Sequence, residues 1–139
     1  MPDTIFDKFP RPPAASLLGW TLLDQDPQKG WIKLAFDGRP EFRNPAGFIQ
    51  GGILAAMLDD TMGPAALIMS GGRLYTATID LNVSFLAPAK PGPLISEGQV
   101  IHLGKSIAFS EARISDENGT LLARATSSAR VVPVERLAS

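Results

Sequence analysis

The feature that most constrains the fold is one long helix-forming stretch, residues 51–69, dominated by Ala, Leu and Met. These residues are good helix formers. At 100° per residue the apolar side chains cover nearly every face, which is typical of a buried helix. Pro64 has no N–H for the carbonyl of Asp60, so we expect a kink there. Other elements must wrap this helix on most sides.

The rest of the chain favours strands, and 13 Gly and 12 Pro keep its elements short. Residues 78–85 alternate strictly between polar and apolar, the period of a half-buried strand. Short turns between successive strands, such as Asn118-Gly119, imply antiparallel pairing. We therefore predict an α+β fold, a curved antiparallel sheet wrapped around one long central helix. The expected strands are residues 19–26, 31–37, 78–85, 94–103, 106–115 and 121–132, with helical turns at 14–18 and a loop at 38–50.

Length and composition exclude several function classes. The 139 residues predict a single domain, 1–139, with a loosely ordered N-terminal segment at 1–13. The net charge of −1 gives no global field for nucleic acid or anionic lipid. There is no Cys and only one His, His102, so we expect neither a thiolate nor a multi-histidine metal site.

The sequence also bears on location. The first ten residues contain Asp3 and Asp7 and lack the apolar core of a signal peptide. The most apolar run, residues 53–69, is interrupted by Asp59 and Asp60, so we expect no membrane span. These observations predict a cytoplasmic protein.

Residues 44–52 run directly into the helix and form a candidate site for a carbonyl oxygen. The first four N–H groups of a helix have no partner within it, and the macrodipole adds partial positive charge. Gly51 and Gly52 carry no side chain, so a ligand can approach the backbone closely. Considered alone, the two glycines are better explained by tight packing against a strand.

Asp59 and Asp60 are the only charged residues of the helix. A carboxylate buried in apolar surroundings is costly, so it is either paired or functional. The two side chains differ by ~100° around the helix and cannot share a face. One can be catalytic while the other is paired or exposed at a subunit edge, although structural hydrogen bonds for both remain an alternative.

At this point the sequence resembles the hotdog-fold acyl-CoA thioesterases, in particular the phenylacetate-pathway and 4-hydroxybenzoyl-CoA group. The resemblance covers residues 44–130. The family has a His-Gly-Gly motif with an Asn six residues before the His and a catalytic acid nine residues after it. Asn44 and Asp59 match these positions, and Gly51 and Gly52 match the glycines. The chain departs from the family at Gln50, which replaces the usual His and cannot carry a proton at neutral pH.

The resemblance implies a mechanism and a set of partners. The Gly51 N–H would bind the thioester carbonyl, and Asp59 of the neighbouring subunit would act as nucleophile or general base. Gln50 and Asn44 would position the carbonyl or the water, and Thr78, where some relatives have Ser, would orient the water. Gly52 and Lys105 would contact coenzyme A, which belongs to the substrate, so no separate cofactor or metal is implied. The family forms homodimers, often paired into homotetramers.

Two other functions remain open at this stage. A hotdog hydratase or dehydratase needs a His paired with an acid, and His102 lies outside the motif region. A non-catalytic module that binds acyl-CoA or another ligand would explain Gln50. It would gain little from an acid such as Asp59 in an apolar helix.

Overall fold

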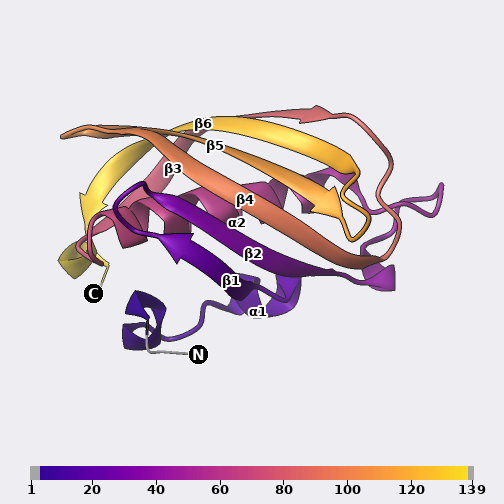
Figure 1. Ribbon diagram of the computed structural model, residues 1–139, viewed down its shortest axis with the longest axis horizontal. Helices are drawn as coiled ribbons and strands as arrows, with labels where there is room; N and C mark the ends of the chain where they lie inside the picture. Colours follow the sequence, from indigo (N-terminus) through magenta and orange to yellow (C-terminus); the bar gives the residue numbers. More distant parts are fainter. Residues whose placement is uncertain (1–3, 138–139) are drawn as a thin grey trace.

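A computed structural model describes residues 4–137 of the chain. Its main element is a six-stranded sheet in the order β1-β2-β4-β5-β6-β3, in which every neighbouring pair is antiparallel. The long helix α2 lies along one face of this curved sheet (Figure 1). The predicted α+β architecture is therefore confirmed. The strands are β1 (Thr21–Asp26), β2 (Trp31–Gly38), β3 (Leu74–Phe85), β4 (Gly92–Leu103), β5 (Ile107–Asp116) and β6 (Leu121–Pro133); the helices are α1 (Pro13–Leu18) and α2 (Gly51–Met69), with 3-10 turns η1 (Ile5–Lys8), η2 (Pro40–Phe42) and η3 (Val134–Arg136).

The core lies between α2 and the sheet. Leu54, Met57 and Leu58 on α2 are buried against fully buried strand residues such as Ile32 and Leu94. By length and composition α2 is the one helix of residues 4–137 that could cross a membrane. The helix is not buried all round as predicted, because Gly52 and Ala56 are exposed. Its open side therefore remains accessible along part of its length.

Pro64 lies inside α2, whose helical assignment runs unbroken from Gly51 to Met69. Because Pro64 has no N–H, the carbonyl of Asp60 loses its helical partner. The indole Nε1 of Trp20 donates to that carbonyl at 3.0 Å. A side chain 40 positions earlier in the sequence thus supplies the hydrogen-bond donor that proline lacks.

The N-terminal segment, expected to be loosely ordered, makes defined contacts from residue 4 onward. Thr4 and Asp7 form a capping box around η1. The ring of Phe6 meets that of Trp20 edge-on at 5.0 Å, and Arg11 donates to the carbonyl of Trp20. This segment therefore holds Trp20 against α2. Residues 1–3 lie outside the described part.

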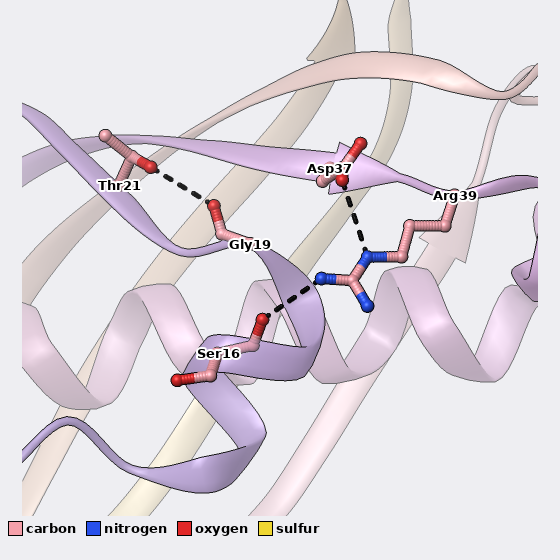
Figure 2. Close-up of polar contacts among 5 residues, drawn as sticks. All are labelled: Ser16, Gly19, Thr21, Asp37 and Arg39. Carbon is pink, nitrogen blue, oxygen red and sulfur yellow. Dashed lines mark hydrogen bonds and ion pairs between the residues drawn. The ribbon is translucent and has the colours of Figure 1, made fainter.

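Helix α1 is fastened to the end of β2. Arg39 donates to the carbonyl of Ser16 at 3.3 Å and pairs with Asp37 at 3.4 Å, while Thr21 donates to the carbonyl of Gly19 at 3.2 Å (Figure 2). Gly19 ends α1 at a φ of +76°, and a Cβ there would lie 2.5 Å from that of Asp37. Only glycine fits this approach.

Strand β3 differs from the expected strand in length and register. It begins at Leu74, four residues before the predicted start, because its first half also pairs with β6. A bulge between Thr78 and Asp80 shifts the register. Thr78 lies opposite Ala129 and Leu81 opposite Ser127, which occupy the same buried face of β6. The strict alternation predicted opposite faces for Thr78 and Leu81; that prediction is wrong, because the bulge adds one residue.

Candidate active site

Asp59 and Thr78 come together between α2 and β3. The Thr78 hydroxyl donates to Oδ1 of Asp59 at 2.8 Å. The bulge turns Thr78 toward the helix, and Ile79, the bulged residue, is left 60% exposed. Asp59 is only partly buried. Its carboxylate is thus oriented by one hydroxyl on an edge strand, in a place that a substrate can reach.

A second group of predicted residues lies at the start of α2. The N–H groups of Ile53 and Leu54 donate to the carbonyl of Gln50, at 2.9 and 3.2 Å. Within residues 4–137, the N–H groups of Gly51 and Gly52 have no recorded acceptor. A Cβ on Gly52 would meet nothing within 4 Å. The helix start therefore offers two free donors, and Gln50, which is exposed, lies directly beside them.

Asn44 shapes the loop that leads into α2. Its Oδ1 accepts from the N–H groups of Ala46 and Phe48, at 3.0 and 3.1 Å. The N–H of Gln50 in turn donates to the carbonyl of Phe42 at 2.8 Å. The side-chain oxygen of Asn44 is thus used within the loop, and only its amide NH₂ is left to contact a ligand.

Lys105 lies far from these groups in the same chain. It is exposed in the turn between β4 and β5. That turn and the start of α2 lie at opposite ends of the molecule (Figure 1). A 19-residue helix such as α2 is about 28 Å long. A single chain therefore does not bring Lys105 to Gly51.

Gly51 and Asp59 are also separated within the chain. Eight residues of helix correspond to about 12 Å, which is too far for both to touch one thioester group. The structure thus forms two half-sites on α2, one with Gln50, Gly51 and Gly52 and one with Asp59 and Thr78. β3, which carries Thr78, is an edge strand of the sheet.

Asp60 points away from Asp59 toward the N-terminal segment. The sequence predicts that the second carboxylate is paired or exposed at a subunit edge; no salt bridge or side-chain hydrogen bond of Asp60 is found among the described residues. Asp60 is partly buried, makes no salt bridge among the described residues, and its Oδ2 is buried without a hydrogen-bond partner. Burial, and secondarily the charge of Asp59, raises the pKa of Asp60 to about 6, while Arg11 opposes the shift.

From the sequence, Phe85 and Trp20 are most simply core or interface residues. The ring of Phe85 lies against Gly51, and the indole of Trp20 donates to the backbone carbonyl of Asp60. The missing N–H of Pro64 indicated that the Asp60 carbonyl needs a donor, but nothing in the sequence identified Trp20. Among residues 4–137 no cluster of three or more His, Asp or Glu could hold a metal.

The chain is similar in sequence to known proteins. The sequence profile of the thioesterase superfamily matches residues 46–123, which include α2, β3 and β4. A protein of Saccharolobus solfataricus named as an esterase is 32% identical over 101 residues, covering 73% of this chain and 71% of that one. Human acyl-coenzyme A thioesterase 13 is 28% identical over 86 residues, covering 60% and 61%.

A solved structure extends the likeness over almost the whole chain. The thioesterase-type, phenylacetic acid degradation-related protein of Ralstonia eutropha JMP134 superposes with a TM-score of 0.80 at 30% identity, covering 91% of this chain and 95% of that one. The helix and antiparallel sheet are those of the hotdog fold of this family. The chain therefore belongs to the thioesterase superfamily.

Proposed function

We propose that the protein is an acyl-CoA thioesterase, which hydrolyses an acyl-CoA to the free acid and coenzyme A. The observation that carries this proposal is the Asp59–Thr78 pair, in which a partly buried carboxylate on a mostly apolar helix accepts a hydrogen bond from the hydroxyl at 2.8 Å. Free N–H groups begin the same helix. A base or nucleophile and a carbonyl-binding donor are the two parts that thioester hydrolysis requires. The acyl group is medium-chain or aromatic in this proposal.

The reaction proceeds by one of two routes. As a general base, Asp59 takes a proton from water, the water oxygen adds to the carbonyl carbon, and the C–S bond breaks. The proton then passes to the departing thiolate. As a nucleophile, the Asp59 carboxylate adds instead, the thiolate leaves, and water hydrolyses the resulting anhydride. In both routes the Gly51 N–H stabilises the negative charge on the carbonyl oxygen.

Neighbouring side chains position the reacting groups. Thr78 holds the Asp59 carboxylate and orients the water. Gln50, beside the free donors, contacts the carbonyl or the water through its amide and moves no proton. Asn44 contributes its NH₂ group and fixes the loop through its oxygen. No metal and no separate cofactor takes part in the proposed reaction.

The active site is completed by two chains. The half-sites of one chain lie about 12 Å apart, and the outer edge of β3 has no partner strand among residues 4–137. Joining the β3 edges of two copies places the helix start of one near Asp59 of the other. Gly52 and Lys105 then contact coenzyme A from different subunits, with Lys105 near its phosphates. The homodimer, its pairing into a homotetramer and a cytoplasmic location are parts of this proposal.

The oligomer is tested by dilution. Light scattering and steady-state kinetics on the same samples should show that activity falls as the dimer dissociates. A monomer with full activity at low concentration would overturn the two-chain site.

The activity is tested with a panel of acyl-CoA substrates, by detecting the thiol released. The expected result is turnover by the natural chain and almost none by Asp59→Asn. If no substrate is hydrolysed but acyl-CoA binds in calorimetry, the protein is a binding module instead. That outcome would place Gln50 among the changes that removed catalysis.

A further inference from the structure

Phe85 is the last residue of β3, and its ring lies against the start of α2. The position that a Cβ would take on Gly51 lies 3.2, 3.3 and 3.7 Å from Cζ, Cε1 and Cε2 of Phe85. These three atoms form the far edge of the ring. The ring edge therefore covers the side of Gly51 that faces β3, whereas Gly52 has nothing within 4 Å.

The backbone around Phe85 holds the ring in place. Phe85 pairs with the fully buried Ala123 of β6. The N–H groups of the next two residues, Leu86 and Ala87, both donate to the carbonyl of Leu122, at 2.8 and 3.2 Å. The ring is nevertheless 54% exposed, so much of its apolar surface still faces open space beside the helix start.

We infer that Phe85 is a specificity-determining residue, whose ring selects acyl groups that are unbranched next to the thioester carbonyl. The inference rests on the proposed function, because it places that carbonyl on the Gly51 N–H. A carbonyl oxygen bound there lies about 2.9 Å from the nitrogen. The first acyl carbon then lies beside the ring edge that already contacts Gly51.

A branch at that first carbon must occupy space next to the ring. A straight chain can instead pass along the ring and bury apolar surface against it. One extra methyl group in a hydrophobic pocket changes kcat/KM by roughly 10–200-fold. Because the ring closes the space from one side only, we expect a preference near the low end of that range. Replacing the Phe85 ring by a flexible aliphatic side chain would leave room for the branch.

The test compares octanoyl-CoA with 2-methylheptanoyl-CoA, which have the same atoms and differ only in branching. The natural chain should prefer octanoyl-CoA by at least about tenfold in kcat/KM. Phe85→Leu should reduce that preference by about tenfold, mainly by accelerating 2-methylheptanoyl-CoA.

Phe109→Leu is the matched control. Phe109 is 47% exposed on β5, and its neighbours along the strand, Ala108 and Ser110, are buried. Its ring therefore lies on the face of the sheet away from α2. This variant loses a similarly exposed ring, and its substrate preference should equal that of the natural chain. If Phe85→Leu does not fold, Phe85→Met gives the same readout.

The outcomes separate the inference from the proposed function. If neither substrate nor any other acyl-CoA is hydrolysed by the natural chain, both fail. If the natural chain hydrolyses both at the same rate, or hydrolyses other acyl-CoAs but neither of these two, or if the preference of Phe85→Leu is unchanged, the role of Phe85 is overturned and the thioesterase activity stands.

Discussion

The two carboxylates of α2 are neighbours in the sequence but lie in different surroundings. Asp59 points to β3 and accepts a hydrogen bond from Thr78 at 2.8 Å. Asp60 points to the N-terminal segment, where one of its oxygens is buried without a partner. The ~100° between successive helix positions separates them. The comparison shows that the surroundings, and not the residue type, decide how each carboxylate behaves. Asp59 is oriented by Thr78 and reachable, whereas burial favours the protonated form of Asp60.

Replacing each of the two carboxylates by asparagine should give the largest difference in activity. Asp59→Asn should lower kcat by about 10²–10⁴-fold, because it removes the base or nucleophile and keeps the shape. Asp60→Asn should have a much smaller effect. Both are measured with one good acyl-CoA substrate after circular dichroism has verified folding. If Asp60→Asn is the inactive variant, the roles of the two positions are exchanged.

Removing the Thr78 hydroxyl should lower the catalytic activity that depends on Asp59 and leave the surroundings of Asp60 unchanged. Thr78→Val loses the hydrogen bond to the carboxylate, which is worth about 1.5–3 kcal/mol for a charged acceptor. The expected result is a decrease in kcat of at least about tenfold, while Thr78→Ser, which keeps the hydroxyl, retains most activity. Equal activity of the two variants would show that Thr78 does not orient Asp59.

On the Asp60 side, Trp20→Phe should affect stability and not catalysis. It leaves the Asp60 carbonyl without its 3.0 Å donor, and Pro64 cannot replace it. An unsatisfied buried acceptor costs about 1–3 kcal/mol, to be measured by urea denaturation. Trp31→Phe is the control, since no hydrogen bond of the Trp31 ring is recorded among the described residues. If the two variants are equally stable, the indole N–H does not support the helix.

The smallest expected effect is on the pH dependence of stability. The pKa of Asp60 is raised from 3.8 to about 6 in the folded chain. Between these values the folded state binds more protons than the unfolded state, so the free energy of unfolding falls as the pH rises. Asp60→Asn removes that fall, which should amount to about 1 kcal/mol after allowance for solvent screening.

The measurement is denaturation of both proteins at pH 4 and at pH 7. The natural chain should lose about 1 kcal/mol more than the variant over this interval. Identical losses would mean that Asp60 titrates at its ordinary value in the folded chain.

Much of the fold and part of the site could be predicted from the sequence. The apolar composition of residues 51–69 indicated the central helix, and the turn residues indicated antiparallel neighbours. Helical periodicity alone separated Asp59 from Asp60. The resemblance to the thioesterases, through the spacing from Gln50 to Asp59, selected the residue that the structure pairs with Thr78. Such features are local, because they depend on residues within a few helical turns of each other.

Tertiary structure decided what depends on distant partners. The bulge in β3 turned Thr78 toward α2, although the alternation of residues 78–85 predicted otherwise. Trp20 was brought to the carbonyl that Pro64 leaves free, and Phe85 to Gly51. A strand register or a contact across 40 residues is set by the packing of the whole sheet on the helix, and no local pattern encodes it. The sequence by itself therefore determined the helices and strands and the types of reactive residue. Only the tertiary structure determined which distant side chains contact those residues.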